Sequence, residues 1–241
     1  MTEDEFLASY DPAVFARPSV TVDLVLMTMV EGVPAVLLRR REEHPFLGQW
    51  ALPGGFVGID EGLDEAALRL LGTEAHLADA YIEQLYTFGA PARDPRTRVV
   101  TIAYFALLPA DRFAAALKQS AELTLAELAV SWPGEVGGPV TACDDDGAVL
   151  PLAFDHADIL GLAIKRLRGK LDYSPIAFAL LPDMFTLRQL QDVHEAILGV
   201  RLNKPAFRRR MLDRGWLEGT GEREAGTSFR PAELYRFKPI D

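Results

Sequence analysis

The sequence has almost no cysteine: Cys143 is the single one among 241 residues. One cysteine cannot close a disulfide within the chain, and it cannot supply the grouped thiolates of a cysteine-based zinc site. Histidine is also scarce, and its four copies are too scattered along the chain to suggest a metal cluster. The sequence therefore predicts neither a disulfide framework nor a bound metal ion.

Long apolar runs are missing as well. The chain has no stretch of about eighteen uncharged apolar residues, which a membrane-spanning helix would need. Its acidic start, MTEDEF, lacks the basic flank of a secretion signal. With 49% hydrophobic and 25% charged residues, the composition is that of an ordinary globular protein with room for one large or two modest domains. We expect a cytoplasmic protein without membrane segments.

Positive charge is in short supply, with 25 Lys and Arg against 35 Asp and Glu. Taken alone, the net charge of −10 argues against nucleic acid as a partner. The charge is uneven, however: residues 1–170 carry 14 Lys and Arg against 25 Asp and Glu, whereas residues 171–241 carry 11 against 10. Five basic residues crowd into positions 201–210, so the net charge of the whole chain conceals a local basic patch.

The stretch 53–77 combines a glycine pair with an amphipathic helix. Gly54 and Gly55 predict a tight turn that brings bare backbone N–H groups close to an anion. Asp60 is the expected helix N-cap. At helical spacing, the apolar face contains Leu63, Ala66, Ala67, Leu70 and Leu71, and the opposite face contains Glu61, Glu65 and Arg69.

This stretch resembles the Nudix box, a glycine turn that leads into a helix with metal-binding carboxylates. Gly55, Glu61 and Arg69 match the family pattern, whereas the positions of its remaining carboxylates and last glycine hold Leu70, Thr73, Glu74 and His76. Because Mg²⁺ needs oxygen ligands to act on a diphosphate, the single remaining carboxylate, Glu74, predicts no efficient hydrolase. We expect no catalytic residue, no required cofactor and at most weak Mg²⁺ binding. The alternative is a merely amphipathic helix that follows a glycine turn.

The sequence on either side of residues 53–77 predicts strands and further helices. Alternation predicts a hairpin from residues 20–26 and 35–39, and strands at 81–88 and 98–108. Asp111 is expected to cap a short helix that reaches Lys118, and Asp155 a longer helix that ends at Gly169. For residues 123–149, strand, loop and acidic turn all stay open.

The motifs WALPGGFV, EQLYTFG, RDPR and AYFAL, in this order, resemble the ADP-ribose-recognising side of the Nudix superfamily. The resemblance implies an α/β/α sandwich. Glycine amides and arginine forks can hold a diphosphate without a metal, and aromatic rings can stack on adenine. The candidate ligand-binding residues are Arg39, Arg41, Trp50, Gly54, Gly55, Phe56, Glu65, Arg69, Phe88, Arg96 and Tyr104. The alternatives are core packing for the aromatic residues, solvated charges for the arginines, and a surface pair for Glu65 and Arg69.

The C-terminal residues predict a helix-turn-helix followed by a wing. Thr186 and Gln189 form a capping-box signature for a helix that ends at Gly199. Asn203 is expected to cap a second, basic helix with Pro205 in its first turn. Inward positions of this helix are Phe207, Met211 and Leu212, and the wing strands are Trp216–Thr220 and Glu233–Phe237.

FTLRQLQDVHEAILG, NKPAFRRRML and RPAELYRF resemble the winged helix of the Nudix-related transcriptional regulators, the NrtR family. Members of this family bind operator DNA as homodimers. Most of them repress genes of NAD synthesis or salvage and are released by ADP-ribose, and some control sugar catabolism instead. The resemblance implies DNA contacts from Thr186, Arg188, Lys204, Arg208, Arg209 and Arg230. A solvated helix face is the alternative for this basic cluster.

Together these patterns predict an α/β protein: an N-terminal arm (1–18), a Nudix-like ligand-sensing domain (19–154), a connecting helix (155–170) and a winged helix-turn-helix domain (171–241). We expect a ligand-responsive repressor of NAD-related genes, with ADP-ribose as its effector and double-stranded operator DNA and a second copy of the chain as its partners. The rival interpretation is a Nudix hydrolase of ADP-ribose or a related diphosphate, in which the C-terminal domain serves only for dimerisation.

Overall fold

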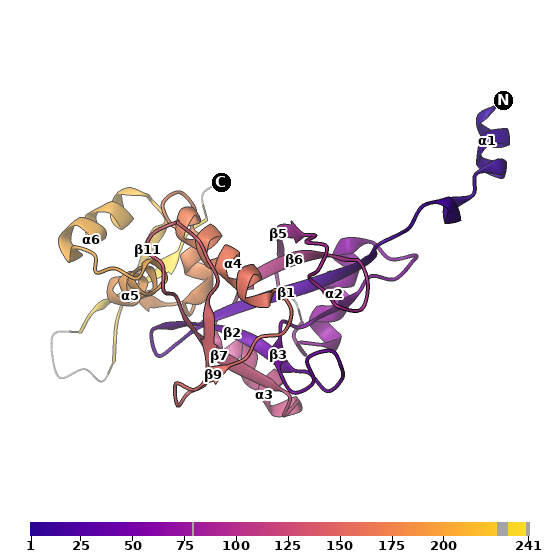
Figure 1. Cartoon of the computed structure of the whole chain (residues 1–241). Coiled ribbons are helices and arrows are strands. Elements are labelled where there is room, and N and C mark those ends of the chain that lie inside the picture. Colours follow the sequence, from indigo (N-terminus) through magenta and orange to yellow (C-terminus); the bar gives the residue numbers. More distant parts are fainter. Residues whose placement is uncertain (79, 226–230, 240–241) are drawn as a thin grey trace.

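The computed structural model describes residues 1–78, 80–225 and 231–239. Figure 1 shows a large twisted sheet with helices on both faces, and a smaller unit that the C-terminal residues form beside it. The first helix, α1 (Glu3–Ser9), stands at the end of an arm that extends away from the rest of the chain. In the described part of the chain, no helix combines the length and the apolar character needed to cross a membrane.

The large sheet consists of β1 (Ser19–Val30), β2 (Val33–Arg40), β3 (Trp50–Ala51), β4 (Gly54–Phe56), β5 (Glu83–Phe88), β6 (Val99–Leu107), β7 (Leu123–Ala129), β8 (Thr141–Cys143) and β9 (Val149–Leu150). Its main order is β5-β6-β1-β2-β7-β8-β9, with β3 beside β2 and β4 beside β1. The pair β1 and β6 is parallel, and β1 is antiparallel to β2 and β4. The predicted hairpin and the strands at 81–88 and 98–108 are confirmed, and the open stretch 123–149 contributes β7, β8 and the start of β9.

The central strand β1 is buried on both faces. Because successive side chains of a strand point to opposite sides, Val25 and Met27 enter one apolar core while Leu24 and Leu26 enter another. The helices of this part are α2 (Leu63–Thr73), α3 (Ala114–Gln119), which follows a short 3₁₀ turn η2 (Ala110–Phe113), and α4 (His156–Lys170). Helices α2 and α3 cover the second core and α4 covers the first. The predicted α/β/α fold class is confirmed.

The C-terminal unit contains η3 (Ile176–Leu180), β10 (Phe185–Thr186), α5 (Leu187–Leu198), α6 (Lys204–Asp213), β11 (Leu217–Arg223) and β12 (Glu233–Phe237). The Oγ1 of Thr186 accepts the N–H of Gln189 at 3.2 Å, and the Oδ1 of Asn203 accepts the N–H of Ala206 at 3.0 Å. Gly199 ends α5 with a φ of 70°. Both predicted caps, the helix-turn-helix and the two wing strands are confirmed.

The two parts of the chain share one apolar core, to which α4 contributes Ile164, α5 contributes Leu190 and α6 contributes Phe207. Arg168 of α4 fastens this junction. Its Nε donates to the Ile197 carbonyl at 2.7 Å, and its Nη1 donates to the carbonyls of Trp132 at 3.1 Å and Gly134 at 2.8 Å. The winged helix is therefore packed on the sheet domain through α4.

The N-terminal arm contains two short helical segments that the sequence analysis did not predict. Residues Glu3–Ser9 form α1, and Pro12–Val14 form the 3₁₀ turn η1. Thr2 and Glu5 make a reciprocal capping box, in which the Thr2 Oγ1 accepts the Glu5 N–H at 3.2 Å. Because every residue of α1 is exposed, the helix has no apolar periodicity that the sequence could have displayed.

Four local predictions are wrong: the N-caps Asp60 and Asp111, the C-cap Gly169 and the inward-facing Leu212. Helix α2 begins after Gly62, because the Glu65 carboxylate accepts the Gly62 N–H at 2.9 Å. Asp111 lies inside η2. Helix α4 continues past Gly169, since the Leu171 N–H still bonds to the Leu167 carbonyl, and Leu212 is 44% exposed beside the buried Met211.

Candidate functional site

A cavity of about 280 Å³ opens where β1, β4 and the start of α4 meet. We call it the arginine cavity. It is lined by Thr21, Asp23, Arg41, Glu43, Ala51, Leu52, Gly54, Gly55, Phe56, Arg93, Asp94, Arg96, Val99, Phe154 and His156. An adjoining cavity of about 440 Å³ shares part of this lining and adds Arg39 and Glu74. Five of the predicted ligand-binding residues therefore lie together: Arg41, Gly54, Gly55, Phe56 and Arg96.

Two arginines flank one aromatic ring in this cavity. The Arg41 and Arg96 guanidinium groups lie 4.9 and 5.9 Å from the Phe154 ring centre. Arg96 forms a fork with Asp94, whereas Arg41 donates to the carbonyls of Pro45 at 2.7 Å and Glu43 at 3.4 Å and meets no carboxylate among the described residues. Burial and the nearby Arg96 lower the pKa of Arg41. The Arg41 guanidinium group, which has no ion pair among the described residues, therefore suits an anion.

The glycine pair has a different role from the predicted turn. Gly54 and Gly55 lie in β4, which pairs with β1, and neither has a positive φ. A Cβ on Gly54 would lie 2.5 Å from the Val22 carbonyl oxygen, and a Cβ on Gly55 would lie 2.8 Å from Leu70. Glycine is needed here because the strand passes so close to β1 and α2, which corrects the prediction of a tight turn.

A buried ionic cluster forms the floor of the arginine cavity. Arg93 donates to Asp155 from Nε at 2.9 Å and from Nη2 at 2.7 Å, and its Nη2 also lies 3.4 Å from Asp23. His156 accepts the Leu52 N–H on Nδ1 at 2.9 Å, and burial lowers the pKa of this histidine. Its Nε2 lies 3.7 Å from Asp23, so the neutral ring directs its proton towards that carboxylate.

None of the residues in this cluster is a predicted site residue. A signal for one of them is present, because Asp23 interrupts the apolar alternation of a strand that is buried on both faces. Thr21 also lines the cavity, and its Oγ1 is a buried hydroxyl without a hydrogen-bond partner in the described chain. A buried polar atom left without a partner favours a polar ligand at this position.

Three predicted ligand-binding aromatics lie outside the arginine cavity. Trp50 and Phe88 pack against the apolar core. Tyr104 lines a separate cavity of about 490 Å³ and donates from its hydroxyl to Asp64 at 2.6 Å. Burial and this bond raise the pKa of Tyr104 to about 12. The geometry thus favours the core-packing alternative for these three residues.

Three carboxylates in and around the Nudix-like helix α2, those of Glu61, Glu65 and Glu74, are each bound to a different neighbour. Glu61 accepts two hydrogen bonds from Arg69, at 2.6 and 2.8 Å, and this contact lowers the pKa of Glu61 to about 2. Glu65 caps the helix, and Glu74 forms an ion pair with Arg39. Leu70 is buried, and the described residues contain no group of three potential ligands placed to hold a metal. The residues present do not fit the Mg²⁺ of a diphosphate hydrolase.

Four predicted DNA-binding residues line one groove of about 680 Å³ between α5, α6 and the wing: Thr186, Arg188, Lys204 and Arg208. Arg188 is 83% exposed, and its ion pair with Asp192 spans 3.7 Å at the surface. Arg209 lies outside this groove, 86% exposed and 3.7 Å from Asp213. Such exposed ion pairs are weak, so the Arg188 and Arg209 side chains remain accessible at the surface. Arg230 lies outside the described residues.

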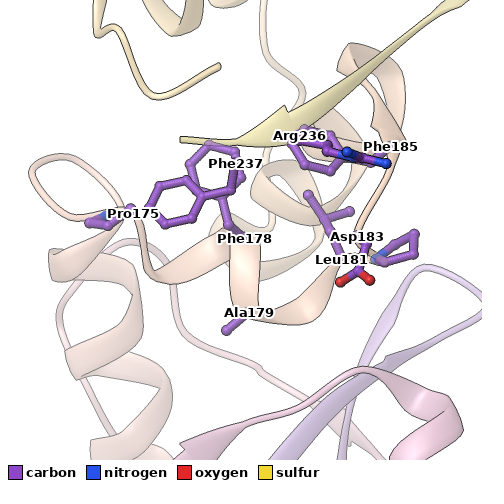
Figure 2. A pocket seen from close by; sticks show the side chains of 9 residues that line it. Pro175, Phe178, Ala179, Leu181, Asp183, Phe185, Arg236 and Phe237 are labelled. Atoms are coloured by element: carbon purple, nitrogen blue, oxygen red, sulfur yellow. The ribbon is translucent and has the colours of Figure 1, made fainter. Parts of the chain in front are cut away.

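A further cavity of about 610 Å³ lies at the base of the winged helix. Figure 2 shows the Phe237 ring against the Phe178 ring, with Phe185 and Arg236 further along the cavity. The two stacked ring centres are 4.7 Å apart. Strand β12 is thereby held against η3, and none of the residues predicted to bind ligand or DNA lines this cavity.

His194 lies between the two helices of the helix-turn-helix. Its Nδ1 is 2.8 Å from the Leu190 carbonyl, its ring packs edge-on against Phe207 with centres 5.0 Å apart, and burial lowers its pKa to about 4. An unfolded chain binds this proton near pH 6.5. The free energy of unfolding should therefore fall by about 3 kcal/mol as the pH drops from about 6.5 to 4.

Chemical denaturation across this pH range tests the prediction. His194→Gln should flatten the profile, and His44→Gln, at an exposed histidine, should leave it unchanged. Because the pKa of His156 is also lowered, part of the slope should remain. If the free energy of unfolding of the His194→Gln variant falls with pH as steeply as that of the wild-type protein, His194 protonates freely in the folded state.

An α/β/α sheet domain with an arginine-lined cavity, packed against a basic winged helix, defines a Nudix-related DNA-binding regulator. Residues 17–133 match the NUDIX domain and residues 177–237 match the NrtR DNA-binding winged helix domain. The chain is 36% identical over 238 residues to the ADPR responsive transcriptional repressor NtrR of Acinetobacter baylyi, covering 98% of this chain and 88% of that protein. The protein belongs to the NrtR family.

Solved structures agree with this assignment. Shewanella oneidensis NrtR complexed with a 27mer DNA is 36% identical, with a TM-score of 0.74 over 91% of this chain and 93% of that one. The NUDIX domain of the same protein complexed with ADP ribose is 34% identical, with a TM-score of 0.51 over 69% and 99% of the two chains. An ADP-ribose pyrophosphatase of Methanocaldococcus jannaschii is 36% identical over 90 residues, which are 37% of this chain and 51% of that protein.

Proposed function

We propose that the protein is a transcriptional repressor that binds operator DNA through α6 and the wing and releases it when ADP-ribose occupies the arginine cavity. The observation that carries this proposal is that the carboxylates in and around α2 are already engaged. Glu61, Glu65 and Glu74 are bound to neighbouring groups, while the adjacent cavity offers guanidinium charge. A Nudix domain built this way suits binding of a diphosphate better than its cleavage.

The arginine cavity has the chemistry for a nucleoside diphosphate. The anionic diphosphate would accept charge-assisted hydrogen bonds from Arg41 and Arg96, and Thr21 would supply a further hydroxyl donor. Phe56, which is 49% exposed at the cavity, offers a ring face for a base. The related repressor from A. baylyi, described as ADPR responsive, and the ADP-ribose complex of the S. oneidensis domain support ADP-ribose as the effector.

The DNA-binding form in this proposal is a homodimer, because two winged helices matched to two half-sites give the specificity that one short groove lacks. Lys204 and Arg208 of α6 line the groove between α5, α6 and the wing, and they would contact phosphates or base edges of the DNA. The controlled genes would be those of NAD synthesis or salvage, since ADP-ribose is a fragment of NAD. The 27mer complex of the S. oneidensis relative supports DNA as the partner.

Selection of binding sites from random-sequence DNA, followed by fluorescence anisotropy near physiological salt, tests this function. We expect a preferred sequence whose affinity falls about 5- to 150-fold when ADP-ribose is added. A Lys204→Gln/Arg208→Gln variant should bind it at least tenfold more weakly and with a smaller salt dependence. Lys165→Gln, on α4 and outside the groove, is the matched control. Selection without any preferred sequence would contradict the proposal.

A second candidate function is hydrolysis of ADP-ribose, which the similarity to the M. jannaschii pyrophosphatase favours. It would require Glu61, Glu65 and Glu74 to leave their present partners and gather around a divalent ion. The assay is release of AMP in the presence of Mg²⁺ or Mn²⁺. Turnover that disappears in Glu74→Gln would establish the hydrolase, and we expect none above background.

A further inference from the structure

Helix α4 has one end in the arginine cavity and the other against the winged helix. Its first residue, His156, lines the cavity, whereas Arg168, more than three turns later, binds the end of α5. A helix of its 15 residues is about 22 Å long and moves as a stiff unit. Figure 1 shows α4 beside the large sheet, reaching towards α5. A change of contacts at the cavity end of α4 can therefore be transmitted along the helix to α5.

An ion pair between Arg93 and Asp155 holds the cavity end of α4, beside the hydrogen bond from Leu52 to His156. The Arg93 fork binds both carboxylate oxygens of Asp155, and the Arg93 side chain is only 4% exposed. Asp155 occupies the N-cap position of α4, yet its side chain accepts no hydrogen bond from the first turn of the helix. The residue that would normally cap α4 is thus engaged by Arg93 instead.

The residue before this cap is under backbone strain. Phe154 has a φ of 55°, a left-handed conformation that is unfavourable for a residue with a side chain. Its ring is held by Arg41 at 4.9 Å and by Phe46, whose ring centre is 4.8 Å away. Of these two contacts, Arg41 also lines the arginine cavity, where a ligand would compete for it.

The far end of α4 determines where the helix-turn-helix lies. Arg168 donates to the carbonyl of Ile197 in the last turn of α5, and the same guanidinium holds the loop carbonyls of Trp132 and Gly134. Helix α5 in turn contacts α6 through His194 and Phe207. A displacement of α4 at this point repositions both helices that face the DNA groove.

We infer that Arg93 exchanges its partner: it binds Asp155 in the free protein, and an anionic diphosphate in the arginine cavity takes over its guanidinium group. This inference rests on the proposed function. The released Asp155 carboxylate then accepts N–H groups of the first turn of α4, at the positive end of the helix dipole. The new cap compensates for the lost ion pair, so both arrangements are stable. The resulting shift of α4 reaches α5 through Arg168 and weakens DNA binding.

The variant Asp155→Asn tests the exchange, because an asparagine caps a helix well but cannot form the ion pair with Arg93. Without ADP-ribose, it should bind the selected DNA at least fivefold more weakly than the wild-type protein. Calorimetry should show that it binds ADP-ribose more tightly by a similar factor, since coupling between two sites is reciprocal. Asp158→Asn, on the exposed side of the same turn, should leave both affinities unchanged.

A second variant, Arg168→Met, acts at the far end of α4. If its circular dichroism spectrum shows a folded protein, it should still bind ADP-ribose and DNA, but ADP-ribose should change its DNA affinity less than twofold. If ADP-ribose weakens DNA binding by this variant as much as in the wild-type protein, the inferred relay from Arg93 through α4 and Arg168 to α5 is wrong.

The two affinities of Asp155→Asn separate the relay from a merely structural role. A structural role would lower the affinities for DNA and for ADP-ribose together, and that result overturns the relay. Wild-type values for both affinities overturn it as well. In either case the proposed function still stands, provided that ADP-ribose weakens DNA binding by the wild-type protein. A wild-type protein whose DNA affinity is the same with and without ADP-ribose overturns the proposed function, and the relay falls with it.

Discussion

Replacing Gly161 with alanine is expected to lower the free energy of unfolding by about 4 kcal/mol or more, which in a chain of this size is a fall in Tm of about 10 °C. A Cβ at this position would lie 1.8 Å from the carbonyl oxygen of Gly138. Neither side can yield easily, because Gly161 is buried within α4 and Gly138 has a φ of +148°. Thermal and denaturant unfolding measure the effect.

Gly72→Ala is the matched control, since this glycine also lies within a helix, and a Cβ there would meet nothing within 4 Å. Alanine has the higher helix propensity, so this variant should gain about 0.5–1 kcal/mol. Equal stabilities of the two variants would mean that α4 does not pass the 137–139 loop as closely as the structure shows. The experiment therefore measures the contact that seats α4 on the sheet domain.

The double variant Arg41→Met/Arg96→Met is expected to lose ADP-ribose affinity by about a thousandfold. A hydrogen bond to a charged group contributes about 1.5–3 kcal/mol, and two such groups flank Phe154 in the arginine cavity. The methionines keep much of the apolar stem that covers the ring. Calorimetric titration with ADP-ribose gives the affinity, and DNA anisotropy should show that operator binding persists but no longer responds.

Arg98→Met provides the control for this double variant. Arg98 lies close in sequence to Arg96, but it is exposed, donates to the Ala90 carbonyl at 3.2 Å and does not line the arginine cavity. Its replacement should change ADP-ribose affinity by less than about twofold. If the double variant binds ADP-ribose like the wild-type protein, the effector site is not the arginine cavity.

Much of the fold could be predicted because its signals are local. The caps of α5 and α6 lie within four residues of the groups they bind, and the apolar face of α2 repeats at helical spacing, so short stretches of sequence were sufficient. Asp60, Asp111 and Asp155 had the same local signal, and none of their side chains caps its helix. For Asp155 the reason is a competing partner, Arg93, which lies 62 residues away in the sequence.

The candidate site could be predicted only in part for the same reason. Arg41, Phe56 and Arg96 lie together as expected, because they belong to short motifs on both sides of the glycine pair. Trp50 and Tyr104 are aromatic residues of the same motifs, but Trp50 packs against the apolar core and Tyr104 donates a hydrogen bond to Asp64. Which face of a strand a ring occupies depends on the register of the sheet, and a single residue type does not encode it.

The sequence by itself determined the separate signals of a sheet domain and a winged helix, the apolar Leu70 where the Nudix pattern has a carboxylate, and the basic character of α6. Each of these depends on residue type and spacing within short stretches. Only the tertiary structure decided that Gly54 serves close packing, that Asp155 binds Arg93 and that Arg168 joins α4 to α5. These contacts unite segments that are far apart in the chain. Periodicity records which face of an element is buried, whereas the partner it meets is set by how the elements pack.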